Sequence, residues 1–70
     1  MEGSELKRRR EALGMTVPQL AELLDVTRIS LYRWEREGVS ERVGMLQLAL
    51  RQLEDQVLRE RMGVEQEQDQ

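Results

Sequence analysis

The 70-residue chain contains no cysteine and no histidine, and it has one proline and two aromatic residues, Tyr32 and Trp34. The absence of cysteine excludes disulfides and thiolate metal sites. The absence of histidine removes the commonest metal ligand and the usual general base. We therefore expect no metal, no cofactor and no enzymatic activity.

No apolar run is long enough to cross a membrane, and no signal-peptide pattern occurs at the start. We expect no membrane partner and a cytoplasmic protein. Seventy residues allow one domain, which buries only about 60% of its unfolded surface. Apolar residues make up 39% and charged residues 36%. With so few aromatics, this composition favours an all-α fold over a β-sandwich.

Charge is unevenly distributed along the chain, whose net charge is −3. Residues 1–36 hold seven basic and six acidic side chains, and residues 37–70 hold four basic and eight acidic. The net charge argues against a generic polyanion binder. Clustered arginines in the first half can still bind phosphate, with the acidic half pointing away.

Helix-starting and helix-ending residues predict two helices in the first third of the chain. Ser4 is a good N-cap and Gly14 a good helix end, which predicts a helix over 5–13 after a loose end at 1–3. Thr16 and Gln19 form a capping box, which predicts a helix over 17–24.

Two further helices are predicted after a turn at 25–26. Thr27 is an N-cap and Gly38 a stop, which predicts a helix over 28–37. Ser40 begins a long last helix over about 40–62, or two helices if the chain breaks near Gly44. The prediction is thus a compact domain of four or five helices over 1–62, followed by a disordered acidic tail at 63–70.

Apolar residues in the last helix recur at alternating steps of three and four, which is the spacing of a coiled-coil seam. They are Val43, Leu46, Leu50, Leu53 and Val57. One interpretation is a final core helix. The sharper one is a dimerisation helix that forms a homodimer through Leu46, Leu50, Leu53 and Val57.

Residues 16–36, TVPQLAELLDVTRISLYRWER, preceded by LxxRREALGMT, resemble the lambda-repressor-like or Cro-like helix-turn-helix family. The matching positions are a small Ala21, apolar Val26 after the turn, and the core anchors Leu31 and Trp34. The resemblance implies a sequence-specific DNA-binding regulator that lays the helix over 28–37 in the major groove. It also implies a structural ion pair between Arg10 and Glu35.

Three positions depart from the family pattern. Asp25 stands where the turn usually has glycine, and Val17 replaces a glutamine that touches phosphate. The loop after residue 38 offers only Ser40 and Arg42 to the DNA backbone. These changes predict weaker backbone anchoring, or anchoring moved to Arg8, Arg9 and Arg42.

The resemblance places the DNA-binding residues around the start of the third predicted helix. We expect Arg28 to contact a guanine, Arg33 to contact a base or a phosphate, and Ile29 to contact a thymine methyl group. The full set is Val17, Thr27, Arg28, Ile29, Ser30, Tyr32, Arg33, Arg36 and Arg42.

The leading hypothesis is a phage or bacterial repressor that binds double-stranded DNA at a palindromic operator as a homodimer. It would be associated with the nucleoid, in the host cytoplasm if phage-encoded. Two alternatives stay open. One is an antitoxin that represses its own operon and binds a toxin. The other is a protein-interaction module that has lost DNA binding.

Overall fold

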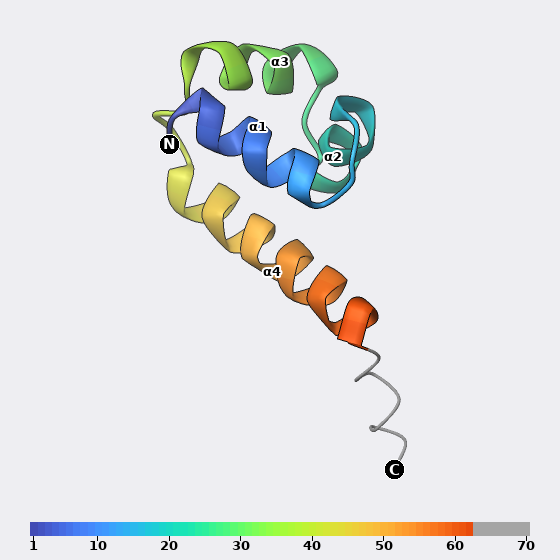
Figure 1. Ribbon diagram of the computed structural model, residues 1–70. Coiled ribbons are helices and arrows are strands. Elements are labelled where there is room, and N and C mark those ends of the chain that lie inside the picture. The colour runs from blue at the N-terminus through green and yellow to red at the C-terminus, as the bar shows by residue number, and fades with distance from the viewer. Residues whose placement is uncertain (63–70) are drawn as a thin grey trace.

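A computed structural model describes residues 1–62, so the predicted acidic tail lies outside the described residues. The described chain is all-α, with four helices: α1 (Gly3–Ala12), α2 (Val17–Leu24), α3 (Arg28–Glu37) and α4 (Val43–Met62) (Figure 1). The all-α, four-helix prediction is confirmed. Because α4 continues unbroken through Gly44, the five-helix alternative is wrong.

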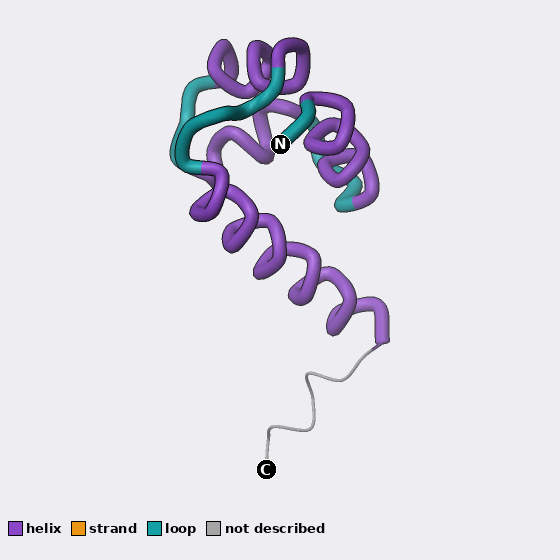
Figure 2. Tube along the Cα trace, turned by 90° about the vertical axis from the view of Figure 1, so that its left-hand side faces the viewer, coloured by secondary structure: helices purple, strands orange, loops and turns teal. Residues whose placement is uncertain are grey.

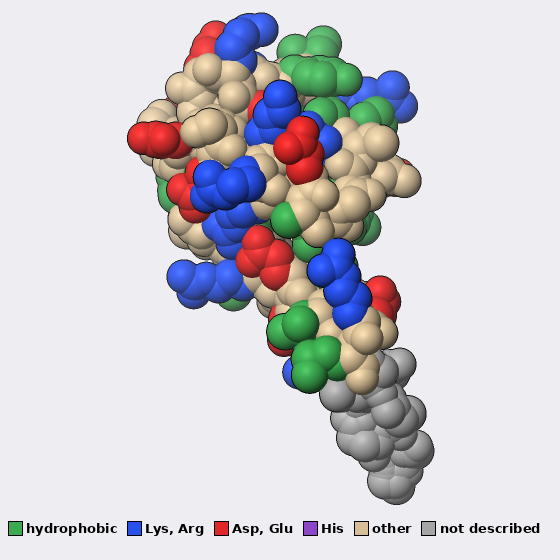
Figure 3. All heavy atoms as spheres, viewed as in Figure 1, with side chains coloured by type: hydrophobic (Ala, Val, Ile, Leu, Met, Phe, Trp, Pro, Cys, Tyr) green, Lys and Arg blue, Asp and Glu red, His purple; other side chains and the backbone are tan. Residues whose placement is uncertain are grey.

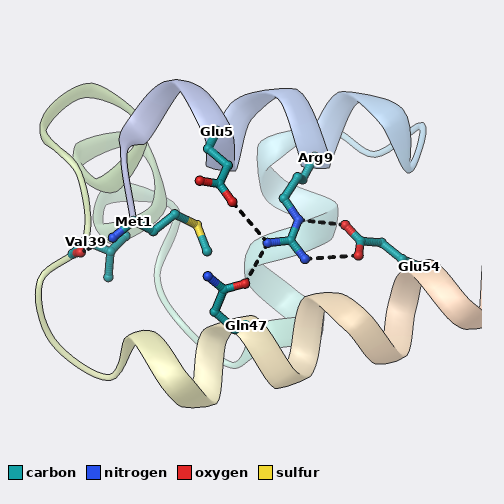
Figure 4. Close-up of polar contacts among 6 residues, drawn as sticks. All are labelled: Met1, Glu5, Arg9, Val39, Gln47 and Glu54. Atoms are coloured by element: carbon teal, nitrogen blue, oxygen red, sulfur yellow. Dashed lines mark hydrogen bonds and ion pairs between the residues drawn. The ribbon is translucent and has the colours of Figure 1, made fainter.

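The chain start is more ordered than predicted. Helix α1 begins at Gly3, and its N-cap, Glu2, makes no side-chain cap, so Ser4 lies inside the helix. The Met1 ammonium donates to the Val39 carbonyl at 2.8 Å, and the Val39 N–H donates to the Met1 carbonyl at 2.8 Å (Figure 4). This pairing ties the start of the chain to the loop after α3, so the predicted loose end is wrong.

The second half of the chain also begins its helix later than predicted. Helix α4 starts at Val43, three residues after the predicted Ser40. Arg42, just before it, has φ 58°, a left-handed conformation that costs energy for a residue with a Cβ. The turn at Arg42 sets the direction in which α4 leaves the loop.

The turns within the first half follow the sequence signals. Thr16 Oγ1 accepts from the Gln19 N–H and the Gln19 side chain accepts from the Thr16 N–H, so the capping box is present. Gly14 and Asp25 both have positive φ, at 74° and 60°. Asp25 therefore takes the left-handed position that glycine usually fills between the two helices of the motif.

The core is built from one fully buried leucine on each helix: Leu6, Leu20, Leu31 and Leu50. Val17, Ala21, Val39 and Leu46 complete it, each less than a tenth exposed. Helix α1 lies between α3 and α4, and α2 covers one end (Figures 1 and 2). The predicted anchors divide accordingly: Ala21 and Leu31 are buried, while Val26 and Trp34 pack against the core from partly buried positions.

This packing corrects the predicted dimer seam. Leu50 is fully buried and Leu46 nearly so inside their own domain, so neither side chain is available to a second copy. Leu53 packs against the same core, and Val57 is half-buried. Leu46, Leu50 and Leu53 therefore attach α4 to its own domain, a role that an a/d spacing alone does not distinguish from a dimer contact. The dimer contact of Val57 stays a prediction.

Arg9 joins α1 to α4 beside that stripe. Its Nε and Nη2 donate to the two Glu54 carboxylate oxygens at 2.8 and 3.0 Å, and its Nη1 donates to Gln47 Oε1 at 2.8 Å (Figure 4). Glu5 lies 3.5 Å away on the same helix as Arg9. Because its guanidinium already bonds to Glu54, Gln47 and Glu5, Arg9 is less available to a DNA phosphate than the sequence predicted.

Candidate nucleic-acid interface

Helix α3 lies on the outside of the molecule, on the side of α1 opposite to α4 (Figures 1 and 2). Arg28, Ile29, Tyr32 and Arg33 are all exposed on it. Their spacing of three and four residues puts them on neighbouring positions of one helical surface. The structure thus brings most of the predicted base-reading residues onto one face.

The first turn of α3 is fixed by its cap. Thr27 Oγ1 accepts from the Ser30 N–H at 3.0 Å and donates to Ser30 Oγ at 2.9 Å. This contact orders the end of the helix that carries Arg28. Ser30 is half-buried but keeps its own hydroxyl proton, so it can still donate to a ligand.

The arginines of α3 differ in how they are engaged. Within residues 1–62, Arg28 and Arg33 form no ion pair and no hydrogen bond with another side chain, whereas Arg36 lies 3.3 Å from the exposed Glu37. An exposed ion pair of that kind contributes little to stability and separates easily. Arg28 and Arg33 are consequently the cations of α3 most available to an anionic partner.

Beneath this face, Arg10 fixes the far end of α3. Its Nε lies 2.6 Å from Glu35 Oε2 and its Nη2 3.2 Å from Oε1, with side chains 12% and 9% exposed. Arg10 Nη1 also donates to the Met15 carbonyl at 2.9 Å. The hydrogen bond with Glu35 raises the pKa of Arg10 further, so the guanidinium stays charged. The structure contains the pair that the resemblance implied, and it holds α3 against α1 and the loop before α2.

The start of α2 offers less to a phosphate than helix starts usually do. The Val17 side chain is buried in the core, so the predicted contact through Val17 is restricted to its backbone. Pro18 has no N–H, and the Gln19 N–H is already bonded to Thr16. Of the first three N–H groups, that of Val17 alone remains for an anion.

Arg42 lies beside Arg33 on a polar hollow of about 290 Å³ that is also lined by Glu37, Ser40 and Glu41. The two carboxylates offset the two guanidinium groups there. The hollow is thus a mixed-charge site next to α3, lined by Arg33 of that helix and by Arg42 of the following loop. Elsewhere on the face seen in Figure 3, basic and acidic side chains are likewise interspersed.

Two contacts at the helix junctions escaped the sequence analysis. Gly3 is buried with its backbone against the carbonyl groups of Trp34 and Glu35, and Arg9 pairs with Glu54 across α1 and α4. A glycine at the start of a helix pattern is a weak signal of close approach, and a pair 45 residues apart leaves no local signal.

In a comparison with protein families, the family model described as Helix-turn-helix matches residues 6–54. Searches among curated proteins and among solved structures find no significant match. No helix of residues 1–62 is long and apolar enough to span a membrane. The same residues contain no group of three or more His, Cys, Asp or Glu arranged to hold a metal ion.

Proposed function

The chain belongs to the lambda-repressor/Cro-like helix-turn-helix family of DNA-binding transcription regulators, and from this premise we propose that it is a sequence-specific repressor. It binds a palindromic operator as a homodimer, with α3 of each copy in the major groove. The two half-sites lie about 34 Å apart, one turn of the duplex. We place it in the cytoplasm, bound to the nucleoid.

One observation carries the proposal: Arg28 and Arg33 project unpaired from a helix that is held rigidly from behind. The Thr27 cap, the buried Leu31 and the Arg10–Glu35 pair fix α3 at its start, middle and end. A helix held in this way presents the two side chains from fixed positions, and the guanidinium fork matches guanine O6 and N7. We assign Arg28 to a guanine and Arg33 to a base or phosphate.

The remaining contacts follow from exposure. Ile29, the most exposed large apolar residue of residues 1–62, is suited to a thymine methyl group, and Tyr32 to a base edge or the backbone. Thr27, Ser30 and Arg36 can bond to bases or phosphate, and the Val17 N–H and Arg42 to phosphate. With one free N–H at α2, backbone anchoring is weak, so affinity depends on having two copies.

Selection of bound sequences from random DNA would first supply the operator. In a gel shift, Arg28→Ala should then weaken operator binding by about 1–3 kcal/mol and relax specificity at one base pair per half-site. Arg51→Ala removes an exposed arginine of α4 and serves as the matched control. Unchanged operator binding by Arg28→Ala would refute the assignment of α3 as the reading helix.

A protein-interaction module on the same fold is the second candidate. The net charge of −3 and the nearly closed anion site at α2 favour it. Titration of random duplex DNA at two salt concentrations separates the two candidates, because a repressor binds non-specifically with a steep salt dependence. The antitoxin hypothesis would rest on residues 63–70, and pull-down of a toxin from source cells tests it.

A further inference from the structure

A cluster of exposed apolar side chains joins α2 to the first two turns of α4. Leu23 is 56% exposed, Met45 74% and Leu48 58%, and Ala49 is half-buried beside them. We call these four residues the α2–α4 patch. Met45 and Leu48 are exposed, whereas Leu46 and Leu50 of the same helix are buried in the core, so α4 is apolar on two sides here.

Three members of the patch, Leu23, Met45 and Ala49, line a groove of about 230 Å³. Leu24, Val26, Trp34 and Leu46 line it as well. Met45 therefore stands at the rim of a hollow that is about large enough for one or two apolar side chains. A protruding side chain and a receiving hollow on the same surface are what a two-fold symmetric interface requires.

We propose that a second copy of this chain occupies the groove, with Met45 of each copy inserted in the groove of the other. This inference refines the proposed function, since it relocates the homodimer contact, but it does not depend on DNA binding. The patch replaces Leu46 and Leu50, which the domain core has already buried.

The charges at the edge of the groove complement one another under two-fold symmetry. Glu41 and Arg42 are adjacent at its rim, both exposed, and neither forms an ion pair within residues 1–62. A two-fold axis beside them sets Glu41 of each copy opposite Arg42 of the other. Such a pair uses two of the five donors of the guanidinium, so Arg42 can still contact phosphate.

The chemistry of the neighbouring segments excludes other occupants from this chain. Residues 63–70, GVEQEQDQ, offer one branched apolar side chain and three carboxylates, which do not suit an apolar groove. Along α4 the same face continues with Gln52 and Gln56, both exposed, so the apolar contact ends after two turns. The interface is therefore centred on Met45.

The position of the patch also suits a dimer that reads two half-sites. Trp34, Glu41 and Arg42 line both the apolar groove and the polar hollow that contains Arg33. The pairing surface thus adjoins the C-terminal half of α3. Symmetric pairing there fixes the distance between the two α3 helices, which one copy alone cannot do.

Sedimentation velocity of the full chain without DNA tests the proposal. Met45→Lys should raise the dimer dissociation constant by about tenfold or more, since it places a charge in an apolar groove. Leu58→Lys is the control: Leu58 is 53% exposed on the same helix but outside the patch, and its dimer should be unchanged. Circular dichroism verifies that both variants fold.

A charge swap tests the symmetric geometry. Glu41→Arg and Arg42→Glu should each weaken the dimer, because each creates two like-charge contacts, and the double variant should restore it. A wild-type chain that stays monomeric at hundreds of micromolar would overturn the proposal. Equal weakening by Met45→Lys and Leu58→Lys, or a double variant weaker than both single ones, would also overturn it.

The test of the dimer contact can fail independently of the test of DNA binding. Arg28→Ala should form a normal dimer and bind the operator more weakly than wild type. A wild-type chain that dimerises through the patch but binds no DNA would refute the repressor proposal alone. A chain that binds its operator while Met45→Lys leaves the dimer intact would refute the pairing face alone.

Discussion

Arg10 on α1 and Glu35 on α3 form a two-pronged ion pair, with Nε 2.6 Å from Oε2, that is almost closed to solvent. The same guanidinium bonds to the Met15 carbonyl, so one side chain connects α1, the loop before α2 and the end of α3. The pair thereby sets how α3 lies on the domain, although neither residue is on the exposed face that would meet DNA.

Removing one partner of this pair should lower the free energy of unfolding. Glu35→Gln leaves the Arg10 charge buried with a weaker acceptor, and we expect a loss of about 3 kcal/mol in the free energy of unfolding, measured by urea denaturation. Glu37→Gln, which breaks the exposed pair with Arg36, should change it by less than about 0.5 kcal/mol. Similar losses in both variants would contradict a special role for the buried pair.

The sequence predicted the helices of this domain well because the signals were local. The Thr16 capping box, the Thr27 cap and Gly38 each act within one helical turn, and the boundaries of α2 and α3 follow them. The starts of α1 and α4 were misplaced by two and three residues because tertiary contacts decided them. Met1 pairs with Val39, which no periodicity encodes.

The candidate site was predicted only where exposure follows from the spacing on α3. Arg9 and Val17 were assigned to DNA because of their residue type and position, yet one pairs with Glu54 and the other enters the core. Leu46 and Leu50 show the same difficulty. An apolar stripe indicates burial, but whether its own domain or a second copy buries it depends on where α4 lies in space.

The Arg9–Glu54 pair should give stability a dependence on acidic pH. The hydrogen bond from Arg9 lowers the pKa of Glu54 below its ordinary value of 4.5. The folded state therefore gains stability above pH 4.5 and loses it as the pH falls through the lower folded-state pKa. As the pH is lowered from 6 to 3, the thermal unfolding temperature of Glu54→Gln should fall less than that of wild type.

Asp55→Asn is the control for that measurement, because Asp55 pairs with Arg59 on the exposed side of α4. The thermal stability of Asp55→Asn should fall with decreasing pH as that of wild type does. Equal declines for wild type and Glu54→Gln would show that the pair does not couple α4 to α1.

Replacement by alanine should have opposite effects on stability at Gly3 and at Gly44. A Cβ at Gly3 would collide with the backbone of α3, including the Trp34 carbonyl oxygen at 2.7 Å, whereas a Cβ at Gly44 meets nothing within 4 Å. We expect Gly3→Ala to lower the free energy of unfolding by about 2 kcal/mol or more, because backbone must move. Gly44→Ala should raise it by about 0.5 kcal/mol through better helix propensity. If both changes were stabilising, α1 would not pack closely on α3.

Asp25 holds the turn between α2 and α3 in a conformation that a residue with a Cβ adopts only at a cost. Its φ of 60° is left-handed, and its side chain accepts no hydrogen bond within residues 1–62. Asp25→Gly should therefore relieve more strain than the added freedom of the unfolded chain costs, raising the free energy of unfolding by about 0.5 kcal/mol. Gly14→Ala is the mirror control, because Gly14 has φ 74° and open space around it, and it should lose about 1 kcal/mol from backbone conformation alone. A loss of stability in Asp25→Gly would mean that the carboxylate stabilises the turn by more than the left-handed backbone costs.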